Sequence, residues 1–381
     1  MLLQPNSVPN STDSHRYCRQ VSIESPGTEA SNFVFNCEVP VPDVPPQGAR
    51  IKVVCAGACY RNRNRLPSAG SQATIPEEEP SQTNYGIRDS ALFPGYEVSG
   101  VIDELGSEVS IGSGCGLTEG QRVVLYPHDA IPHGYSDYVV VSDLQFVIPV
   151  PDNLPLSVAA MLPTGALLGK NAVLAAHDNV LRLLEERPDQ DVKILVVGTG
   201  GLALWAIRIA AHHFGHSGHR DRVKVTVACM RDEGFAVAKS IHNVNLVQWS
   251  EDLYENQIIE RTTNACNGLV DIVIDFGTTA RTLNRSLQCL NRKGVVLVNQ
   301  EVAERLLPRF SPIAEQKEQK IQAVAKGDVE QLKELVELVS SGEIVPPPHT
   351  VFPADQACSV VQKLSKSEIP GRAILRFHDI E

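Results

Sequence analysis

The sequence predicts an α/β protein in which a doubly wound parallel sheet is joined to a second, mostly β domain. Three observations support this fold class: strands alternate with helices after residue 163, a glycine-rich turn joins the first strand to the first helix of that alternation, and short strands separated by turns lie on both sides of it. Alternation of this kind is typical of a parallel sheet with helices on both faces. The chain of 381 residues is long enough for two domains.

Residues 164–327 form the alternating region, which we expect to be the parallel-sheet domain. Its first strand, 192–197 (VKILVV), is a continuous apolar run, as expected for a strand that is buried on both faces. Three more strands and three helices are expected after it, the strands at 223–228, 270–274 and 294–298 and the helices at 202–214, 233–242 and 279–290.

The flanking segments 17–163 and 328–381 predict the mostly β domain. Segments 50–56 (RIKVVCA) and 121–126 (QRVVLY) are rich in β-branched residues, as strands are. Residues 1–16 are expected to be a disordered tail, and the unpatterned stretch 67–90 an exposed loop. At the other end we expect a helix at 329–340 and two short strands, which return to the first domain; these strands lie near 350–352 and 373–377.

Composition excludes several classes of protein. The net charge is −11 and the chain has no basic run, whereas nucleic-acid binding needs clustered Lys and Arg. The longest apolar stretch, 192–214, contains a glycine cluster and Arg208, so no membrane span is expected. The nine cysteines are scattered and no secretory signal precedes them, which favours free thiols in the cytoplasm.

The glycine-rich turn predicts a nucleotide site. It runs Gly198-Thr199-Gly200-Gly201-Leu202-Ala203 and fits the pattern G-x-G-x-x-A between a strand and a helix. The first glycine permits the tight turn, the second lets a pyrophosphate approach, and the small alanine lets the helix pack on the sheet. Free N–H groups at the helix N-terminus would then bind the phosphates. The alternative is a tight turn that binds nothing.

The end of the second strand bears on the choice between NADP and NAD. An Asp or Glu usually stands there to hold the adenine ribose hydroxyls. In this chain the position falls at Cys229, and Arg231 follows two residues later. An arginine can pair with a 2′-phosphate, which favours NADP over NAD. Asp232 and Glu233 would offset this preference, and Arg231 as a solvated loop residue is the alternative.

Four further segments resemble motifs of the medium-chain dehydrogenase/reductase superfamily, in the family's order. Residues 93–102 (FPGYEVSGVI) resemble its P-x-x-x-G-H-E-x-x-G-x-V segment, and 120–123 (GQRV) its G-D-R-V turn. Residues 271–277 (DIVIDFG) resemble D-V-V-I-D-x-x-G, and 371–375 (GRAIL) the closing G-R-x-V-L. The resemblance covers about residue 33 to the end. It implies a Rossmann domain, a GroES-like catalytic domain, and cofactor contacts from Thr164, Phe276 and Gly277. It also implies a homodimer formed through the last strand of the parallel sheet, near 305–311, unless Arg305, Arg309 and two prolines blunt that edge.

The zinc ligands of the family's alcohol dehydrogenases are mostly replaced. Cys59 falls at the first ligand position, but Tyr96 replaces the histidine and the third position falls at or near Pro163. A catalytic zinc needs three protein ligands and a water, and Cys59 with Glu97 does not complete that set. Residues 123–142 contain no cysteine for the family's structural zinc. We therefore expect no metal, as in the zinc-free quinone and enone reductases.

The remaining chemistry is hydride transfer between a nicotinamide cofactor and a carbonyl, enone or alcohol. Tyr96 and then Tyr60 are the candidates to donate a hydrogen bond to the substrate oxygen, although either is equally an aromatic packed in the cleft wall. Cys59 is a candidate reactive thiol, and Glu97 is expected to orient its neighbours. The alternative function is a non-catalytic, nucleotide-binding member with an interaction or regulatory role. Histidines 212, 213, 216 and 219 are expected to be a solvated connection.

Overall fold

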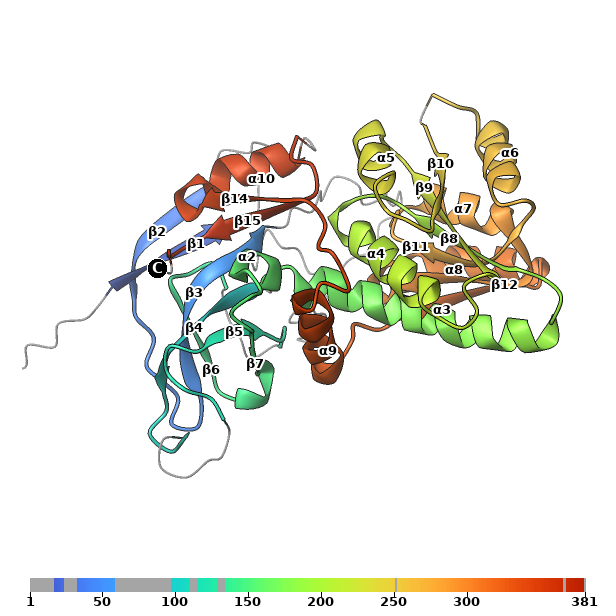
Figure 1. Cartoon of the computed structure of the whole chain (residues 1–381). Coiled ribbons are helices and arrows are strands. Elements are labelled where there is room, and N and C mark those ends of the chain that lie inside the picture. Colours follow the sequence, from blue (N-terminus) through green and yellow to red (C-terminus); the bar gives the residue numbers. More distant parts are fainter. Residues whose placement is uncertain are drawn as a thin grey trace, which may run out of the picture.

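The structure is a computed structural model that describes residues 17–23, 33–58, 97–109, 116–128, 134–250, 252–365 and 368–379. Most of its strands belong to two sheets, which stand side by side in Figure 1. One sheet has six strands, all parallel, and the other has seven, mostly antiparallel. The predicted fold class is therefore confirmed.

The parallel sheet has the strand order β10-β9-β8-β11-β12-β13. Its strands are β8 (Val192–Val197), β9 (Val223–Cys229), β10 (Asn245–Gln248), β11 (Val270–Asp275), β12 (Leu290–Asn299) and β13 (Lys320–Val324). The chain winds outward from β8 in one direction and from β11 in the other, so the strand order reverses between these two neighbours. In open sheets of this type, ligands bind at the carboxyl ends of the strands beside such a reversal.

Two apolar cores lie on the two faces of this sheet. On one face α3 (Leu167–Glu186) and α4 (Gly201–Gly215) pack on the strands through side chains such as Trp205, which is fully buried. On the other face lie α6 (Glu255–Ala265), α7 (Ala280–Cys289) and α8 (Gln300–Gln316), while the short α5 (Asp232–Ala238) follows β9. Among the described residues no helix is long and apolar enough to cross a membrane.

The second sheet joins the two ends of the chain. Its order is β14-β15-β3-β4-β5-β7, with β6 paired to β3. The strands are β3 (Ala49–Ala58), β4 (Val98–Leu105), β5 (Arg122–Leu125), β6 (Tyr138–Val141), β7 (Val147–Pro149), β14 (His349–Pro353) and β15 (Arg372–Arg376). Because β15 pairs antiparallel with β3, the C-terminal segment completes the N-terminal sheet. A separate hairpin, β1 (Tyr17–Ile23) and β2 (Phe33–Pro40), precedes it.

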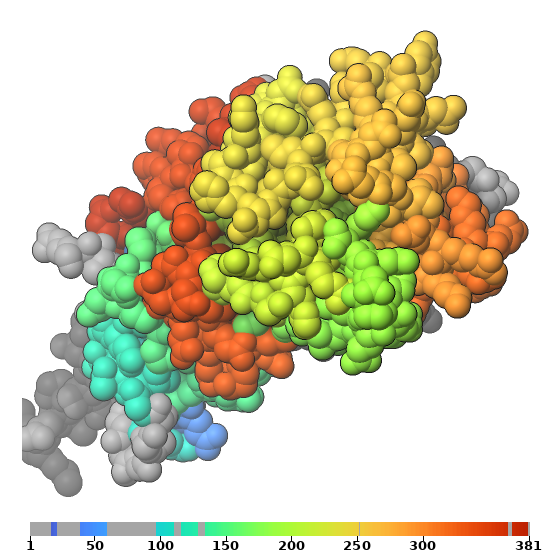
Figure 2. Space-filling view, turned by 45° about the vertical axis from the view of Figure 1, so that its right-hand side comes forward, coloured from blue at the N-terminus to red at the C-terminus, as the bar shows by residue number. Residues whose placement is uncertain are grey.

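Short helices complete this domain and its junction with the parallel sheet. The β domain carries α2 (Leu156–Ala159) and α10 (Ala357–Ser365). The helix α9 (Val329–Ser340) was predicted at these bounds. Asp328 caps its N-terminus, because the Asp328 side chain accepts a hydrogen bond from the Gln331 N–H. Figure 2 shows the orange-red segment around α9 lying between the green residues of the β domain and the yellow-green α4.

The strand expected at 305–311 is wrong, because these residues lie inside α8. The buried side chains Val302, Leu306 and Phe310 recur every four residues, which is a helical spacing, and Asn299 caps the helix by accepting from the Val302 N–H at 2.7 Å. Both prolines of α8 lie on its exposed side. The edge strand of the sheet is instead β13.

Candidate functional site

The glycine-rich turn lies at the carboxyl end of β8, beside the reversal in strand order. Gly198 has a φ of 106°, a backbone conformation that side chains disfavour. Gly200 precedes α4, and a Cβ built on it would meet no atom within 4 Å. The turn therefore has open space beside Gly200, directly before the first N–H groups of α4, which begins at Gly201. This arrangement suits a bound phosphate group.

A second turn, residues 276–279, faces the glycine turn from the carboxyl end of β11. The Phe276 N–H donates to the Val197 carbonyl at 3.0 Å. A Cβ on Gly198 would lie 3.6 Å from the Phe276 carbonyl carbon, so the two turns are in contact. The carboxylate of Asp275 accepts from the Gly277 N–H at 2.7 Å beneath this turn. Burial raises the pKa of Asp275 to about 6, although its hydrogen bonds act in the opposite direction.

Three side chains from distant parts of the sequence meet beside the glycine turn. The Glu97 carboxylate, which is 2% exposed, pairs with the Arg372 guanidinium and accepts a hydrogen bond from the Thr164 hydroxyl. Thr164 lies in the π-helical turn Leu162–Ala166, a distortion that is frequent at functional sites. A Cβ on Gly201 would lie 2.4 Å from Arg372 Cδ, so this arginine packs against the start of α4.

The end of β9 shows how the residues expected to select the cofactor are placed. The Cys229 side chain is fully buried, and burial raises the pKa of its thiol to about 12. The Arg231 side chain is exposed at the start of α5. Its neighbour Asp232 accepts a hydrogen bond from the Gln248 amide. Thr199, in the glycine turn, packs against α5, because a Cβ on Gly234 would overlap its side chain.

The structure therefore brings together Glu97, Thr164 and the predicted residues of the glycine turn, which are Gly198, Thr199, Gly200, Gly201 and Leu202. Phe276 and Gly277 lie on the facing turn. Cys59, Tyr60 and Tyr96 lie outside the described residues. Within the described part of the chain, no group of three His, Cys, Asp or Glu side chains is placed to hold a metal ion.

Sequence reasoning did not single out Arg372 or Asp275 as site residues. Both stand in segments that were quoted as motifs, Arg372 after Gly371 and Asp275 before Phe276. Gly371 has a φ of 76°, and a Cβ there would lie 2.0 Å from the Pro348 carbonyl oxygen, so this glycine is required to let the chain enter β15 at this place. In the sequence, Gly371 was thus the signal that could have marked this segment, and with it Arg372, as part of the site.

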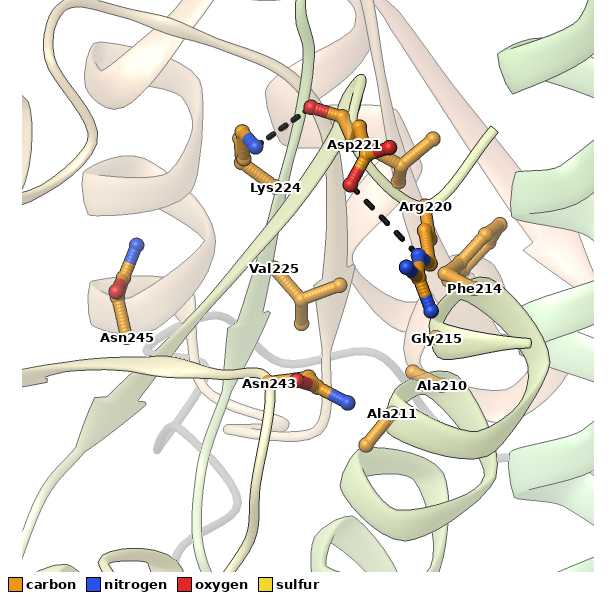
Figure 3. Close-up of a pocket in the computed structure, with 11 residues that line it drawn as sticks. Ala210, Ala211, Phe214, Gly215, Arg220, Asp221, Lys224, Val225, Asn243 and Asn245 are labelled. Carbon is orange, nitrogen blue, oxygen red and sulfur yellow. Dashed lines mark hydrogen bonds and ion pairs between the residues drawn. The ribbon is translucent and has the colours of Figure 1, made fainter. Parts of the chain in front are cut away.

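The hollow in Figure 3 does not lie at the glycine turn. Its volume is about 420 Å³ and it is lined by the end of α4, the start of β9, and Asn243 and Asn245. These segments lie at the amino ends of the strands, opposite the glycine turn. Near this end of α4, His212 and His213 are half-buried, and a hydrogen bond of 3.0 Å joins the rings of His213 and His177. The expectation of a fully solvated histidine cluster is therefore wrong for these two residues.

Comparisons with known proteins agree with this geometry. Residues 254–375 match the family model described as "Zinc-binding dehydrogenase". Cinnamyl alcohol dehydrogenase 8 of Arabidopsis thaliana is 24% identical over 358 residues, which cover 86% of this chain and 87% of that protein. A zinc-type alcohol dehydrogenase-like protein of Schizosaccharomyces pombe is 23% identical over 308 residues, which cover 75% of this chain and 82% of that protein.

The fold is shared with solved structures over almost its whole length. Acetophenone reductase from Geotrichum candidum, solved in complex with NAD, superposes with a TM-score of 0.63 at 17% identity and covers 98% of this chain and 99% of its own. A doubly wound sheet with a glycine turn, joined to a β domain that both ends of the chain build, is the fold that this chain shares with these dehydrogenases and reductases. The chain is similar to the medium-chain dehydrogenase/reductase superfamily of oxidoreductases.

Proposed function

We propose that the protein transfers a hydride between NADP or NAD and a carbonyl, enone or alcohol, without a catalytic zinc. The observation that carries the proposal is the Gly198 turn, whose positive φ and unobstructed Gly200 direct the N-terminus of α4 to the reversal in strand order. The bound nicotinamide supplies or accepts the hydride. The chain's own residues bind and orient the reactants and hold the proton that the substrate oxygen gains or loses.

Three groups support binding of the diphosphate. The N–H groups at the start of α4 donate to anions, and the helix dipole favours negative charge there. Arg372 packs beside Gly201 and brings guanidinium N–H donors there, while the buried Glu97 balances its charge. Its buried partner Glu97 and the Thr164 hydroxyl fix the position of the guanidinium.

The end of β9 supports a preference for NADPH. The buried Cys229 offers no carboxylate to the ribose hydroxyls of NADH, and the exposed Arg231 is free to pair with a 2′-phosphate. Such a charge-assisted bond is worth about 1.5–3 kcal/mol, and Asp232 and Glu233 favour the lower end. Arg231→Ala is expected to narrow the ratio of NADH to NADPH dissociation constants about tenfold. Arg220→Ala, which removes an exposed arginine that precedes the amino end of β9, is the control and should leave the ratio unchanged.

Zinc-free chemistry is supported by the residues that stand at the ligand positions. Proline offers no ligand atom, so Pro163 cannot bind a metal. Glu97 is already paired with Arg372 and Thr164. In this proposal the Tyr96 phenol, with Tyr60 as second candidate, donates a hydrogen bond to the substrate oxygen. Elemental analysis of the dialysed protein is expected to find far less than one zinc per chain, and a stoichiometric, retained zinc would refute this part.

A non-catalytic role is the second candidate, because the replaced ligands agree with it equally well. Turnover of NADPH with a panel of aldehydes, enones and quinones separates the two. Tyr96→Phe is expected to lower the rate while cofactor affinity is kept. Tight cofactor binding without turnover of any member of the panel would favour the non-catalytic role.

Assembly and location complete the proposal. Among the described residues β13 has a neighbouring strand on one side only, and a hollow of about 480 Å³ lies along α8 beside Ala323 of this strand. We propose the homodimer contact at this edge. Six cysteines, Cys18, Cys55, Cys229, Cys266, Cys289 and Cys358, are free thiols, which supports a reducing compartment such as the cytoplasm.

A further inference from the structure

The 276–279 turn contains a residue in an unfavourable backbone conformation. Thr278 has a φ of 57°, in the left-handed region, where a β-branched side chain is rarely found. Such a conformation is disfavoured and persists only where the surroundings impose it. The contacts around the turn identify what imposes it.

From below, the turn is held by a buried carboxylate. Asp275 accepts from the Gly277 N–H at 2.7 Å and from the Ser286 hydroxyl at 3.0 Å, and it is buried, as is Ser286. From behind, Thr282 fills the space beside Gly277, because a Cβ there would lie 2.5 Å from Thr282 Cγ2. A capping box between Thr279 and Thr282 holds the far end of the turn. None of these contacts reaches the Thr278 carbonyl oxygen.

From above, α8 supplies a third contact. The Arg305 guanidinium donates to the Thr278 carbonyl. It reaches this atom because α8 begins at the carboxyl end of β12, and β12 lies beside β11, whose carboxyl end leads into the turn. Arg305 itself is exposed and forms no part of the apolar core. The hydrogen bond from Arg305 to the Thr278 carbonyl therefore contributes nothing to the apolar packing of α8.

We propose that Arg305 and Asp275 are positioning residues, which hold the 276–279 turn through its Thr278 carbonyl and its Gly277 N–H in the strained form that faces the glycine turn. The inference rests on the proposed nucleotide site, because the held turn contacts Gly198. Loss of the Arg305 contact lets Thr278 relax out of the left-handed region. Phe276 and Gly277 then lose their fixed position against the glycine turn, and the cofactor must restore it on binding.

Hydrogen exchange tests the contact in the cofactor-free protein. Arg305→Ala is expected to speed exchange in peptides that contain residues 276–279. The matched control is Arg309→Ala, an exposed arginine on the next turn of α8 that stacks on Phe310. It should leave exchange unchanged. Equal exchange in Arg305→Ala and wild type would overturn the proposal, whatever the protein binds.

Cofactor titration tests the consequence. Arg305→Ala is expected to weaken NADPH binding about threefold to tenfold, and Arg305→Lys, which keeps a donor, to recover part of the loss. Asp275→Asn, which keeps one acceptor for the Gly277 N–H, should cause a smaller loss in the same direction. Unchanged affinity in Arg305→Ala would contradict the inference alone, whereas a wild-type protein that binds neither NADPH nor NADH would contradict the proposed function.

Thr278→Gly separates positioning from direct contact with the cofactor. Glycine adopts a positive φ without strain, so the turn no longer needs Arg305 to hold it. In the Thr278→Gly background, Arg305→Ala is therefore expected to cost little affinity. An equal loss in both backgrounds would mean that Arg305 acts on the cofactor itself, and would overturn its role as a positioning residue.

Discussion

A negative charge at Gly200 should weaken cofactor binding by about two orders of magnitude while the protein stays folded. The φ of Gly200 is not positive, and a Cβ there would meet no atom within 4 Å. An added side chain therefore has room and imposes no strain. A carboxylate at this place would face the phosphates at the start of α4. Two unit charges about 5 Å apart repel by about 3 kcal/mol at an effective dielectric of 20, which corresponds to about two decades in affinity.

Gly200→Asn is the matched control, since it adds the same bulk without the charge. The assay is fluorescence titration with NADPH and NADH, with the midpoint of thermal unfolding measured beside it. We expect Gly200→Asp to bind at least tenfold more weakly than Gly200→Asn, with both midpoints close to wild type. If the aspartate variant binds as tightly as wild type, the glycine turn is only structural and the reasoning fails.

Three further predictions concern stability and assembly. Arg372→Met should lower the free energy of unfolding by about 3–5 kcal/mol, because it leaves the Glu97 charge buried and without its guanidinium; a urea titration that finds a loss below about 1 kcal/mol would contradict this. The pKa of His213 is lowered, first by burial and then by the neighbouring His177. The unfolded chain therefore binds more protons than the folded protein, and the free energy of unfolding should fall as the pH drops below about 6.5. His213→Gln should reduce that fall between pH 7.5 and 5.5, whereas the exposed His219→Gln should not. Light scattering should find a species of twice 41.4 kDa, and a monomer at all concentrations would exclude the dimer.

The parallel sheet was predictable because its signals are local. Residues 192–197 are apolar on both faces of the strand apart from Lys193, and the glycine turn follows at once, so one short segment indicates the fold and predicts a nucleotide site. The helix α9 was equally clear, since Asp328 caps it and its apolar side chains repeat at helical spacing. In α8 the same spacing of Leu306 and Phe310 was present, but the family resemblance led us to expect the last strand of the sheet there.

The contacts between distant segments were not predictable from one sequence. Glu97 and Arg372 are 275 positions apart, and only the pairing of β15 with β3 brings them together. Arg305 reaches Thr278 because α8 is a helix at the edge where β11 ends. No local pattern announces either contact, since each depends on which strands become neighbours. The sequence motifs thus locate the site, and the fold decides which charges complete it.

We propose that this chain binds a nicotinamide cofactor at the Gly198 turn and uses it for hydride transfer. The most direct measurement is titration of the dialysed protein with NADPH and NADH, followed by the absorbance of NADPH in the presence of an aldehyde, enone and quinone panel. We predict saturable binding, tighter for NADPH, and oxidation of NADPH by at least one member of the panel without added zinc. If neither dinucleotide binds up to millimolar concentration, the proposed cofactor binding at the Gly198 turn is contradicted.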